Sequence, residues 1–465
     1  MKLQFKTTPW KHQLAAVKYL MPLSYGALYT DMGTGKTKII IDLIANKGYK
    51  RVLIVAPKKV CSVWGREFDK HAPEILQSPL NLSDIAGDKK VQAVNNLLNL
   101  PSKGGTLTLV CNYDSIWREP FKTFLLKKFK AEAVICDESH RIKSPSSKCS
   151  RFLTQLGKLT PNRFLMTGTP LAQSPLDIYA QYRFLNPLIF GTNFGNFKQE
   201  YANWIQVPAG FPMLDKKNPY KNLDKLQEKM FSCAFKTDSD IELPPTQDIL
   251  LDFNLSTDAE KHYKELQKQG CMELGGGVVD GTCVLTLVTR LQQLTSGYLP
   301  IENEEGVKSF VEVDTGRQDT LSSMFEDLPP REPIVVFAKY RKDISNILEI
   351  VKQSGRKSSE LSGKADTLKE WMAGKTDVLV VQISSGAEGI DLTRSHYCVY
   401  YTMTHSLSQY LQSRKRVHRP GQDNPVIYYT LVARMKKGVT IDEKILEALW
   451  SNQEVINTIM YDREV

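Results

Sequence analysis

A glycine-rich loop near the N-terminus is the feature that most constrains the fold of this chain. Thr30–Thr37 reads TDMGTGKT, follows the apolar stretch Ala27–Tyr29 and precedes the apolar run Ile39–Ile41. A strand, a glycine-rich loop ending in Gly-Lys-Thr and a helix together form a phosphate-binding arrangement, because glycines let backbone N–H groups face the anion. The helix N-terminus adds positive charge. The alternative is a chance glycine-rich turn, which the flanking strand and helix disfavour, although Thr30 replaces the first glycine of the general pattern.

The residue types in this loop suggest individual roles. Lys36 is expected to reach the β- and γ-phosphates of a nucleotide, and the Thr37 hydroxyl to hold Mg²⁺. The remaining residues expected to surround the nucleotide are Met32, Gly33, Thr34, Gly35 and Lys38.

Two acidic residues, Asp137 and Glu138, directly follow the apolar run Ala133–Cys136. Side chains at the carboxyl end of a parallel strand point into the crevice where ligands bind. We expect Asp137 to hold the Mg²⁺, through water, and Glu138 to polarise the attacking water. A polar helix cap is the alternative, but the phosphate loop upstream favours the catalytic interpretation.

The order of apolar runs predicts two α/β lobes joined near residue 245. Short β-branched runs alternate with stretches of helix length, which indicates βαβ units and parallel sheets. The expected strands are Arg51–Ala56, Thr106–Cys111, Ala133–Cys136 and Arg163–Met166, then Pro333–Ala338, Asp377–Gln382, Cys398–Tyr401 and Pro425–Leu431. Leu255–Gly297 looks helical with a glycine interruption, and Thr440–Leu449 looks like a helix.

A basic segment, Arg414–Arg419 (RKRVHR), lies in the second series. Arg416 and Arg419 are three residues apart, which would place them on one helical face. Either guanidinium could stabilise the charge that develops on a transferring phosphate, as an arginine finger does. The alternative is a basic patch on a solvated helix.

The amino-acid composition limits which partners, structural sites and cellular locations fit this chain. Lys and Arg number 61 against 51 Asp and Glu, and the net charge of +10 fits either a lysine-rich surface or a polyanionic partner. None of the eight cysteines forms a CxxC pair, which argues against structural zinc and a disulfide framework and favours a reducing compartment. No apolar run is long enough to span a bilayer. We expect no membrane association and a cytoplasmic location, in a bacterium or in the host cell of a virus.

The motif order resembles that of helicase superfamily two, specifically its Swi–Snf branch of double-stranded DNA translocases. The resemblance covers nearly the whole chain. Besides the phosphate loop, its segments are Trp10–Gln13, Pro57–Phe68, Asn112–Asp114, Asp137–His140 (DESH), Arg141–Ser144, Thr167–Pro170, Tyr179–Pro187, Phe235–Pro245, Leu291–Gly297, Pro333–Phe337, Ser384–Leu392 and Gln412–Gln422.

The resemblance implies two RecA-like lobes with parallel sheets and mainly helical insertions, and ATP bound in the cleft between them. Lobe 1 would cover residues 1–245, with an insertion at about 186–240, and lobe 2 would cover residues 246–465. Lobe 2 would hold a helical insertion at about 255–300 and its RecA-like part at about 315–465. The resemblance adds Gln13 as the adenine contact, with Gly389 and Asp391 as further nucleotide contacts. Its candidate contacts to the phosphate backbone are Lys58, Lys59, Asn112, Lys143, Lys339, Ser384 and Ser385.

The expected function is an ATP-dependent motor that moves on or remodels double-stranded DNA, with ATP and Mg²⁺ as cofactors. Binding through phosphates carries no sequence information, so it should be independent of sequence. Two alternatives stay open: a strand-separating DNA or RNA helicase of the same superfamily, and a DNA-binding scaffold with a vestigial ATP site. The sequence leaves the oligomeric state open, and a monomer fits it.

Overall fold

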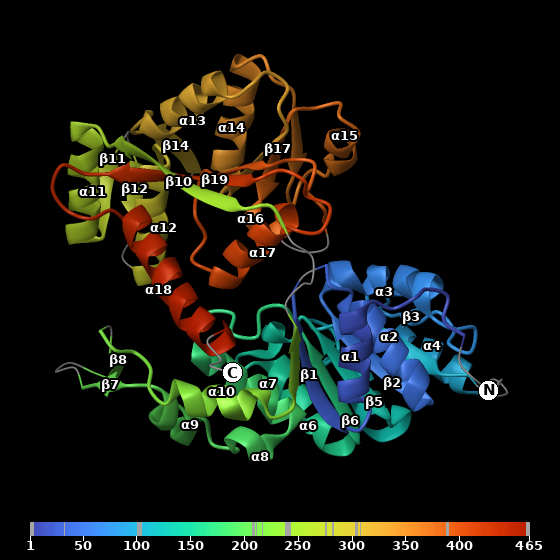
Figure 1. The fold of residues 1–465 in the computed structure, drawn as a ribbon. Helices are drawn as coiled ribbons and strands as arrows, with labels where there is room; N and C mark the ends of the chain where they lie inside the picture. Colours follow the sequence, from blue (N-terminus) through green and yellow to red (C-terminus); the bar gives the residue numbers. More distant parts are fainter. Residues whose placement is uncertain are drawn as a thin grey trace. The chain divides into compact units, whose positions relative to one another are not determined.

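The computed structural model describes residues 4–31, 33–99, 105–206, 210, 212–215, 217–237, 243–274, 277–280, 283–302, 306, 308–386 and 390–461. The chain divides into two compact units, Met1–Glu242 with Glu454–Val465, and Leu243–Gln453. Each unit contains a parallel sheet accompanied by helices (Figure 1), which confirms the two predicted RecA-like α/β lobes. No helix in the described ranges is long and apolar enough to cross a membrane.

Unit 1 holds a seven-stranded parallel sheet in the order β3-β4-β2-β5-β6-β1-β9. Its strands are β1 (Tyr25–Thr30), β2 (Arg51–Ala56), β3 (Leu80–Asn81), β4 (Leu107–Asn112), β5 (Ala133–Asp137), β6 (Asn162–Met166) and β9 (Ala234–Thr237). The four strands expected from apolar runs agree with β2, β4, β5 and β6 within one residue. In β1, Tyr25 lies opposite Arg163 of β6 on one side, and Ala27 lies opposite Ala234 of β9 on the other.

Helices cover both faces of this sheet. The helices are α1 (Lys11–Leu20), α2 (Lys36–Lys47), α3 (Lys58–His71), α4 (Gly87–Leu98), α5 (Phe121–Phe124), α6 (Lys148–Leu159), α7 (Ile178–Leu185), α8 (Pro187–Phe190), α9 (Phe194–Tyr201) and α10 (Leu223–Phe231), and a small hairpin pairs β7 (Trp204–Ile205) with β8 (Met213–Leu214). Val52 and Ile54 of β2 pack in one cluster with residues of α1, α2 and α3. The intervening Leu53 and Val55 are equally buried and point to the opposite face. Burial on both faces explains why these strands are continuous apolar runs in the sequence.

Unit 2 holds a six-stranded parallel sheet in the order β10-β19-β18-β15-β17-β16. Its strands are β10 (Thr246–Asn254), β15 (Ile334–Ala338), β16 (Ser358–Leu361), β17 (Val378–Gln382), β18 (Tyr397–Tyr400) and β19 (Val426–Arg434), and its helices are α11 (Thr257–Gln269), α12 (Val284–Thr295), α13 (Gly316–Asp327), α14 (Arg341–Gln353), α15 (Leu368–Met372), α16 (Ile383–Gly386), α17 (Leu407–Val417) and the first part of α18 (Ile441–Tyr461). The four strands expected from the second series are confirmed.

Two features of unit 2 differ from the sequence predictions. The glycine interruption is a hairpin of β11 (Cys271–Leu274) and β12 (Gly277–Asp280), which joins β13 (Tyr298–Glu302) and β14 (Lys308–Glu312) in an antiparallel sheet. The C-terminal helix does not end at Leu449. The polar run at 451–453 suggests an end there, but α18 continues because Ile456 and Ile459 are buried beyond it.

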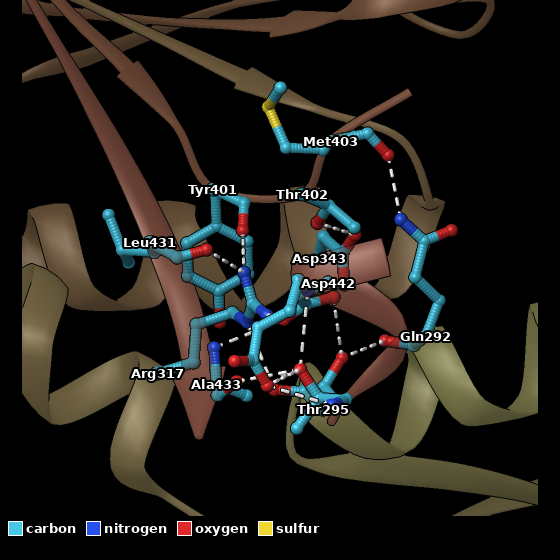
Figure 2. Close-up of polar contacts among 12 residues, drawn as sticks. Gln292, Thr295, Arg317, Asp343, Tyr401, Thr402, Met403, Leu431, Ala433 and Asp442 are labelled. Atoms are coloured by element: carbon cyan, nitrogen blue, oxygen red, sulfur yellow. Dashed lines mark hydrogen bonds and ion pairs between the residues drawn. The ribbon is translucent and has the colours of Figure 1, made fainter. Parts of the chain in front are cut away.

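A buried ion pair holds the core of unit 2 together (Figure 2). The Arg317 guanidinium of α13 pairs with the Asp442 carboxylate of α18. It also donates to the carbonyls of Thr295 at 3.0 Å and Leu431 at 3.1 Å, and to that of Tyr401. Asp442 accepts further hydrogen bonds, one of them from the Thr295 hydroxyl at 3.0 Å. Both charges are therefore compensated inside the core, at the meeting point of four elements.

Candidate functional site

The glycine-rich loop joins β1 directly to α2 in unit 1. Thr30 ends β1, and the helix begins at Lys36. Gly33 and Gly35 have φ angles of 82° and 78°, in the left-handed region that favours glycine. A Cβ on Gly35 would collide with the side-chain amide of Gln13. The loop therefore needs glycine for its shape, and it places its backbone at the positive end of a helix.

Side chains of the loop hold it in this shape. The Thr34 hydroxyl donates to the Asp31 carbonyl at 2.7 Å and lies 2.9 Å from Thr30 Oγ1. Lys36 Nζ donates to the carbonyls of Thr30 and Asp31, both at 2.9 Å. The Lys36 amine therefore lies over the loop itself, where a phosphate would arrive.

The other predicted members of this loop differ in their surroundings. Thr37 is half-buried in the first turn of α2, beside Lys36. Lys38 is buried and pairs with the Asp42 carboxylate one turn further along α2, so its amine points into the protein. Met32 lies outside the described residues.

Helix α1 supports the loop from outside. Gln13 Nε2 donates to the Thr34 carbonyl at 3.1 Å, and His12 Nε2 lies 2.8 Å from the same oxygen. Gln13 Oε1 accepts from the backbone N–H of Trp10 at 2.9 Å. The structure thus brings Gln13 to the phosphate loop. His12 was not among the predicted site residues. Its position in the segment Trp10–Gln13, one residue before Gln13, was the only indication of its role.

The two acidic residues follow β5 directly. The Asp137 carboxylate accepts a hydrogen bond of 3.0 Å from Trp64 Nε1. Glu138 has a φ of 51°, a strained conformation for a residue with a side chain. Its Oε2 accepts from the Thr167 hydroxyl at 3.0 Å and lies 3.3 Å from His140 Nδ1. Strain held in place by specific bonds is typical of a functional site.

The two carboxylates have opposite electrostatic environments. Burial, together with the neighbouring charge of Glu138, raises the pKa of Asp137 well above its usual range. Burial alone would also raise the pKa of Glu138, but the hydrogen bond and charge of His140, with Lys36 and Thr167, bring it below its usual value. Glu138 is therefore the ionised member at neutral pH, and Asp137 is a carboxylate whose charge needs a cation.

The available oxygen donors fit Mg²⁺. Asp137 and Thr37 offer a carboxylate and a hydroxyl, which are hard ligands suited to this ion. The described part of the chain holds no cluster of three or more acidic, histidine or cysteine ligands. Mg²⁺ does not need such a cage, because it keeps several waters and takes further ligands from phosphates.

A second set of contacts holds the acidic loop in position. The Ser139 hydroxyl donates to Gln181 Oε1 of α7 at 2.7 Å, and Gln181 Nε2 donates to the Pro170 carbonyl at 2.7 Å. The loop after β6, which contains Thr167 and Pro170, is thereby joined to the residues that follow β5. The predicted site did not include Thr167, His140 or Gln181, although all three stand in motifs named from the sequence: Thr167–Pro170, Asp137–His140 and Tyr179–Pro187.

Unit 2 contains the predicted arginines. Arg416 is buried in the last turn of α17, which ends at Val417, and Arg419 lies beyond the helix end. The expectation that both share one helical face is therefore wrong, because the helix stops before Pro420. Arg419 Nη1 donates to the Ile390 carbonyl at 3.3 Å.

The predicted Asp391 lies close to one of these arginines. Its Oδ2 is 3.8 Å from Arg419 Nε, and its Oδ1 accepts from the Thr393 hydroxyl at 2.8 Å. Arg419 Nε is buried, and within the described ranges it has no hydrogen-bond partner. Gly389 lies outside the described residues.

The candidate phosphate contacts of unit 1 follow the carboxyl ends of neighbouring strands. Lys58 and Lys59 come after β2, Asn112 ends β4, and Lys143 follows β5. Lys58 is exposed, with its amine 3.3 Å from a carboxylate oxygen of Asp84.

Lys143 and Asn112 are held more closely by the protein. Lys143 Nζ lies 3.5 Å from an oxygen of Asp177. Asn112 is buried and accepts a hydrogen bond from the Ser115 hydroxyl, so its amide faces the protein.

In unit 2, Lys339 follows β15 and donates to Gln292 Oε1 at 2.6 Å. The Tyr340 hydroxyl donates to the same oxygen at 2.9 Å. Gln292 Nε2 donates to the Met403 carbonyl at 2.7 Å (Figure 2). Burial lowers the pKa of Lys339 to about 8.

The two predicted serines lie on the short helix α16. Ser384 is exposed there. The side chain of Ser385 lies outside the described residues.

Comparison with known proteins gives two family matches. The model of the SNF2-related domain matches residues 12–297, and that of the helicase conserved C-terminal domain matches residues 317–421. Together they include every predicted site residue described above.

Individual relatives are distant. The ISWI chromatin-remodeling complex ATPase ISW1 of Saccharomyces cerevisiae is 25% identical over 94% of this chain and 39% of that protein. An uncharacterized ATP-dependent helicase of Mycoplasma pneumoniae is 23% identical over 97% of this chain and 42% of that protein. The chain thus spans about two fifths of the length of these relatives. A solved structure, the Sulfolobus solfataricus SWI2/SNF2 ATPase core in complex with dsDNA, aligns over 99% of this chain and 98% of that chain, with 18% identity and a TM-score of 0.44.

Proposed function

Because the chain belongs to the family of SNF2-related domains, we propose that it hydrolyses ATP to move along, or to remodel, double-stranded DNA. The observation that carries the proposal is the acidic pair in unit 1, a buried Asp137 beside a half-buried Glu138. Asp137 and Glu138 lie at the carboxyl end of a strand in the sheet whose strand β1 leads into the phosphate loop. Relatives with ATPase or ATP-dependent helicase in their names support the same activity.

Each residue of the proposed site has a distinct task. Lys36 would exchange its two loop carbonyls for phosphate oxygens of ATP. Thr37 and Asp137 would hold Mg²⁺, which supplies positive charge to the phosphates. Glu138, ionised and fixed by Thr167, would accept a hydrogen bond from the attacking water and so orient it. Backbone N–H groups of the loop from Gly33 to Gly35, with Thr34, would contact the phosphates.

Gln13 is proposed as the adenine contact. Its amide is already oriented by Thr34 and Trp10, so it offers an ordered polar group beside the loop. An ordered amide can recognise a base edge at a lower entropic cost than a mobile one. Lys38 forms a buried ion pair with Asp42 within α2. We therefore propose that Lys38 contributes to nucleotide binding indirectly, by positioning this helix.

Arg416 and Arg419 are proposed as arginine fingers, with Asp391 orienting Arg419. A buried guanidinium nitrogen without a hydrogen-bond partner among the described groups is costly, and an anionic ligand would supply that hydrogen bond. Arg419→Lys should slow hydrolysis more than it weakens ATP binding, because the finger acts on charge that develops during the reaction. A fall in ATP affinity with normal turnover of bound ATP would contradict this role.

The proposed partner is the phosphate backbone of duplex DNA. Lysines after β2 and β5 provide contacts of the kind that bind phosphates without reading the bases. Lys339, held by Gln292, provides an ordered cation of the same kind. Lys59, Asn112, Ser384 and Ser385 remain candidates for the same role.

The steady-state rate of ATP hydrolysis tests the proposal. It is measured without nucleic acid, with single-stranded DNA, with duplex DNA and with RNA, at matched nucleotide concentration and low salt. We expect duplex DNA to stimulate hydrolysis most, and Lys36→Ala to abolish turnover while DNA binding persists. Equal stimulation by single strands or RNA would favour a strand-separating helicase, and hydrolysis in the Lys36→Ala variant would disprove the site. Displacement of a third strand from a DNA triplex then tests movement itself.

A further inference from the structure

A pocket of 690 Å³ opens in unit 1 at residues that have no role in the proposed ATP site. It lies between the loop after β4, with the adjoining α5, and the first turns of α6. Its main lining residues are Trp117, Arg118, Lys122, Lys148, Arg151 and Gln155. A volume of this size is in the range of pockets that bind small ligands, about 300–1,000 Å³.

The charge of this pocket is strongly positive. Four of its lining residues are cationic and one, Glu119, is acidic. Glu119 is paired with Lys122 at 3.3 Å. In the portion of the chain that the structure describes, Lys148 and Arg151 have no carboxylate partner. A concave surface with uncompensated cations concentrates positive potential and favours an anionic ligand.

Helix α6 presents these cations in one direction. Lys148, Arg151 and Gln155 are three and four residues apart, so they lie along one face of the helix. Lys148 is the first residue of the helix, after Ser147, whose hydroxyl accepts from the N–H of Ser150 at 3.1 Å. The positive end of this twelve-residue helix therefore adds to the charge of the side chains.

An aromatic ring lies among the cations. The Lys148 amine is 5.1 Å, and the Arg118 guanidinium 5.4 Å, from the centre of the Trp117 ring. Arg118 Nε donates to the Asp114 carbonyl at 2.9 Å, and this hydrogen bond fixes the position of the Arg118 side chain. The half-buried indole thus has two cations over its ring. A ligand that used the whole pocket would combine a flat apolar group with negative charge.

A nucleotide has this combination, with a base for the ring and a phosphate for the cations. The bases of a duplex are stacked and paired, so only an unstacked base could lie against Trp117. The pocket also lies close to the candidate site, because the Tyr113 hydroxyl, in the loop that leads to Trp117, donates to the Asp137 carbonyl at 2.6 Å. We propose that the pocket binds one unstacked nucleotide, its base against Trp117 and its phosphate between Arg118, Lys148 and Arg151.

This binding goes beyond the proposed movement on duplex DNA and needs no ATP hydrolysis. Its source would be an unpaired DNA strand or a free mononucleotide, which share the chemistry that the pocket recognises. An unpaired strand would give the motor a second contact beside its duplex, at a strand end or a displaced strand.

The test uses the full chain and an oligothymidylate that contains bromodeoxyuridine, which crosslinks to stacked aromatic residues on irradiation. We expect a crosslink at Trp117, located by mass spectrometry. Lys148→Ala/Arg151→Ala should weaken both the crosslink and the affinity about tenfold or more, because two phosphate contacts are lost. Lys127→Ala/Lys128→Ala removes the same charge from exposed residues of unit 1 outside the pocket, and should change neither.

Further measurements separate the possible outcomes. Trp117→Leu should weaken oligothymidylate binding by about 5- to 150-fold if a base stacks there, with thermal unfolding showing that the variant is folded. Competition by thymidine monophosphate would identify free nucleotides as a source, and its absence would identify the strand. The proposal is overturned if the crosslink maps elsewhere, or if the pocket variant binds oligothymidylate as well as the control variant. These results do not depend on whether duplex DNA stimulates hydrolysis.

Discussion

Glu138 is the residue whose loss should separate ATP binding from ATP hydrolysis. In Glu138→Gln the side chain keeps its size and its bond from Thr167 but loses the charge that orients water. We expect the DNA-stimulated hydrolysis rate to fall about 10²- to 10⁴-fold, the usual contribution of a positioned base. Binding of a fluorescent ATP analogue should persist. Glu74→Gln, an exposed change in the same unit, is the control, and near-normal turnover in Glu138→Gln would refute the assignment.

Lys339 should make DNA binding sensitive to pH in a range where most lysines are insensitive. Burial lowers its pKa to about 8, with Asp343 and Asp442 opposing the shift, and the nearby His405 has its pKa lowered to about 4, so it stays neutral in this range. A lowered lysine pKa means that the folded protein binds fewer protons than the unfolded chain between about pH 8 and pH 10.4, so stability rises with pH there.

Phosphate binding responds to pH in the opposite direction, because it needs the charged amine. Duplex affinity should therefore fall above about pH 8, by at most about tenfold per pH unit. Lys339→Arg should bind with a flat profile, because a guanidinium keeps its charge. Fluorescence anisotropy across this range provides the measurement. Identical profiles for the two proteins would show that Lys339 does not contact the DNA.

At the residue scale, local motifs were readable from sequence and distant partners were not. The phosphate loop and acidic pair were predicted because neighbouring residues define them. In the basic segment RKRVHR, nothing in the sequence indicates that the arginines have different roles. Arg414 is held by Asp248 of β10 and lies 3.7 Å from the Tyr428 ring of β19, so it is structural. Its carboxylate partner lies more than 160 residues away in sequence, and no local pattern encodes such a pairing.

At the element scale, the strands buried on both faces were predictable, and the edge elements were not. β15 is apolar throughout and β17 is apolar up to its last residue, Gln382, whereas β10 mixes polar and apolar residues and has only Phe253 buried. Such a strand forms because β19 pairs with it along its whole length. The strands of the β11 and β12 hairpin are short, and β12 depends on β13 for its second neighbour. These strand pairings belong to the tertiary structure, so the local sequence of a strand does not reveal them.

The junction of α13, α12, β19 and α18 predicts a large effect of a single substitution. Asp442→Ala would leave Arg317 buried without its counter-charge, and should cost about 3–5 kcal/mol of unfolding free energy. Urea unfolding of the full chain measures this, with the exposed Asp423→Ala in the same unit as the control. Arg317→Met/Asp442→Leu removes both charges and should recover much of the loss. If Asp442→Ala unfolds like the control, the network contributes little to stability.

At the scale of the whole molecule, the charge of +10 fits a partner that is itself a polyanion. The net charge does not tell which basic residues contact that partner and which are only solvated at the surface. The salt dependence of DNA binding separates these two groups. Each phosphate contact releases condensed counterions, so the slope of log affinity against log salt changes by about 0.9 per contact on a duplex. Two duplexes of unrelated sequence should therefore bind with equal affinity and equal slope.

Single lysines can be assigned by the same measurement. Lys58→Ala should reduce the slope by about 0.9 if the lysine leaves Asp84 for a phosphate, because one contact is lost. Lys158→Ala removes an equal charge from an exposed position at the end of α6, and should lower affinity slightly without changing the slope. Equal slopes in wild type and Lys58→Ala would mean that the amine stays with Asp84 and that the duplex passes elsewhere. An affinity that differed between unrelated duplexes would instead require contacts that read bases, which the proposed set of lysines does not provide.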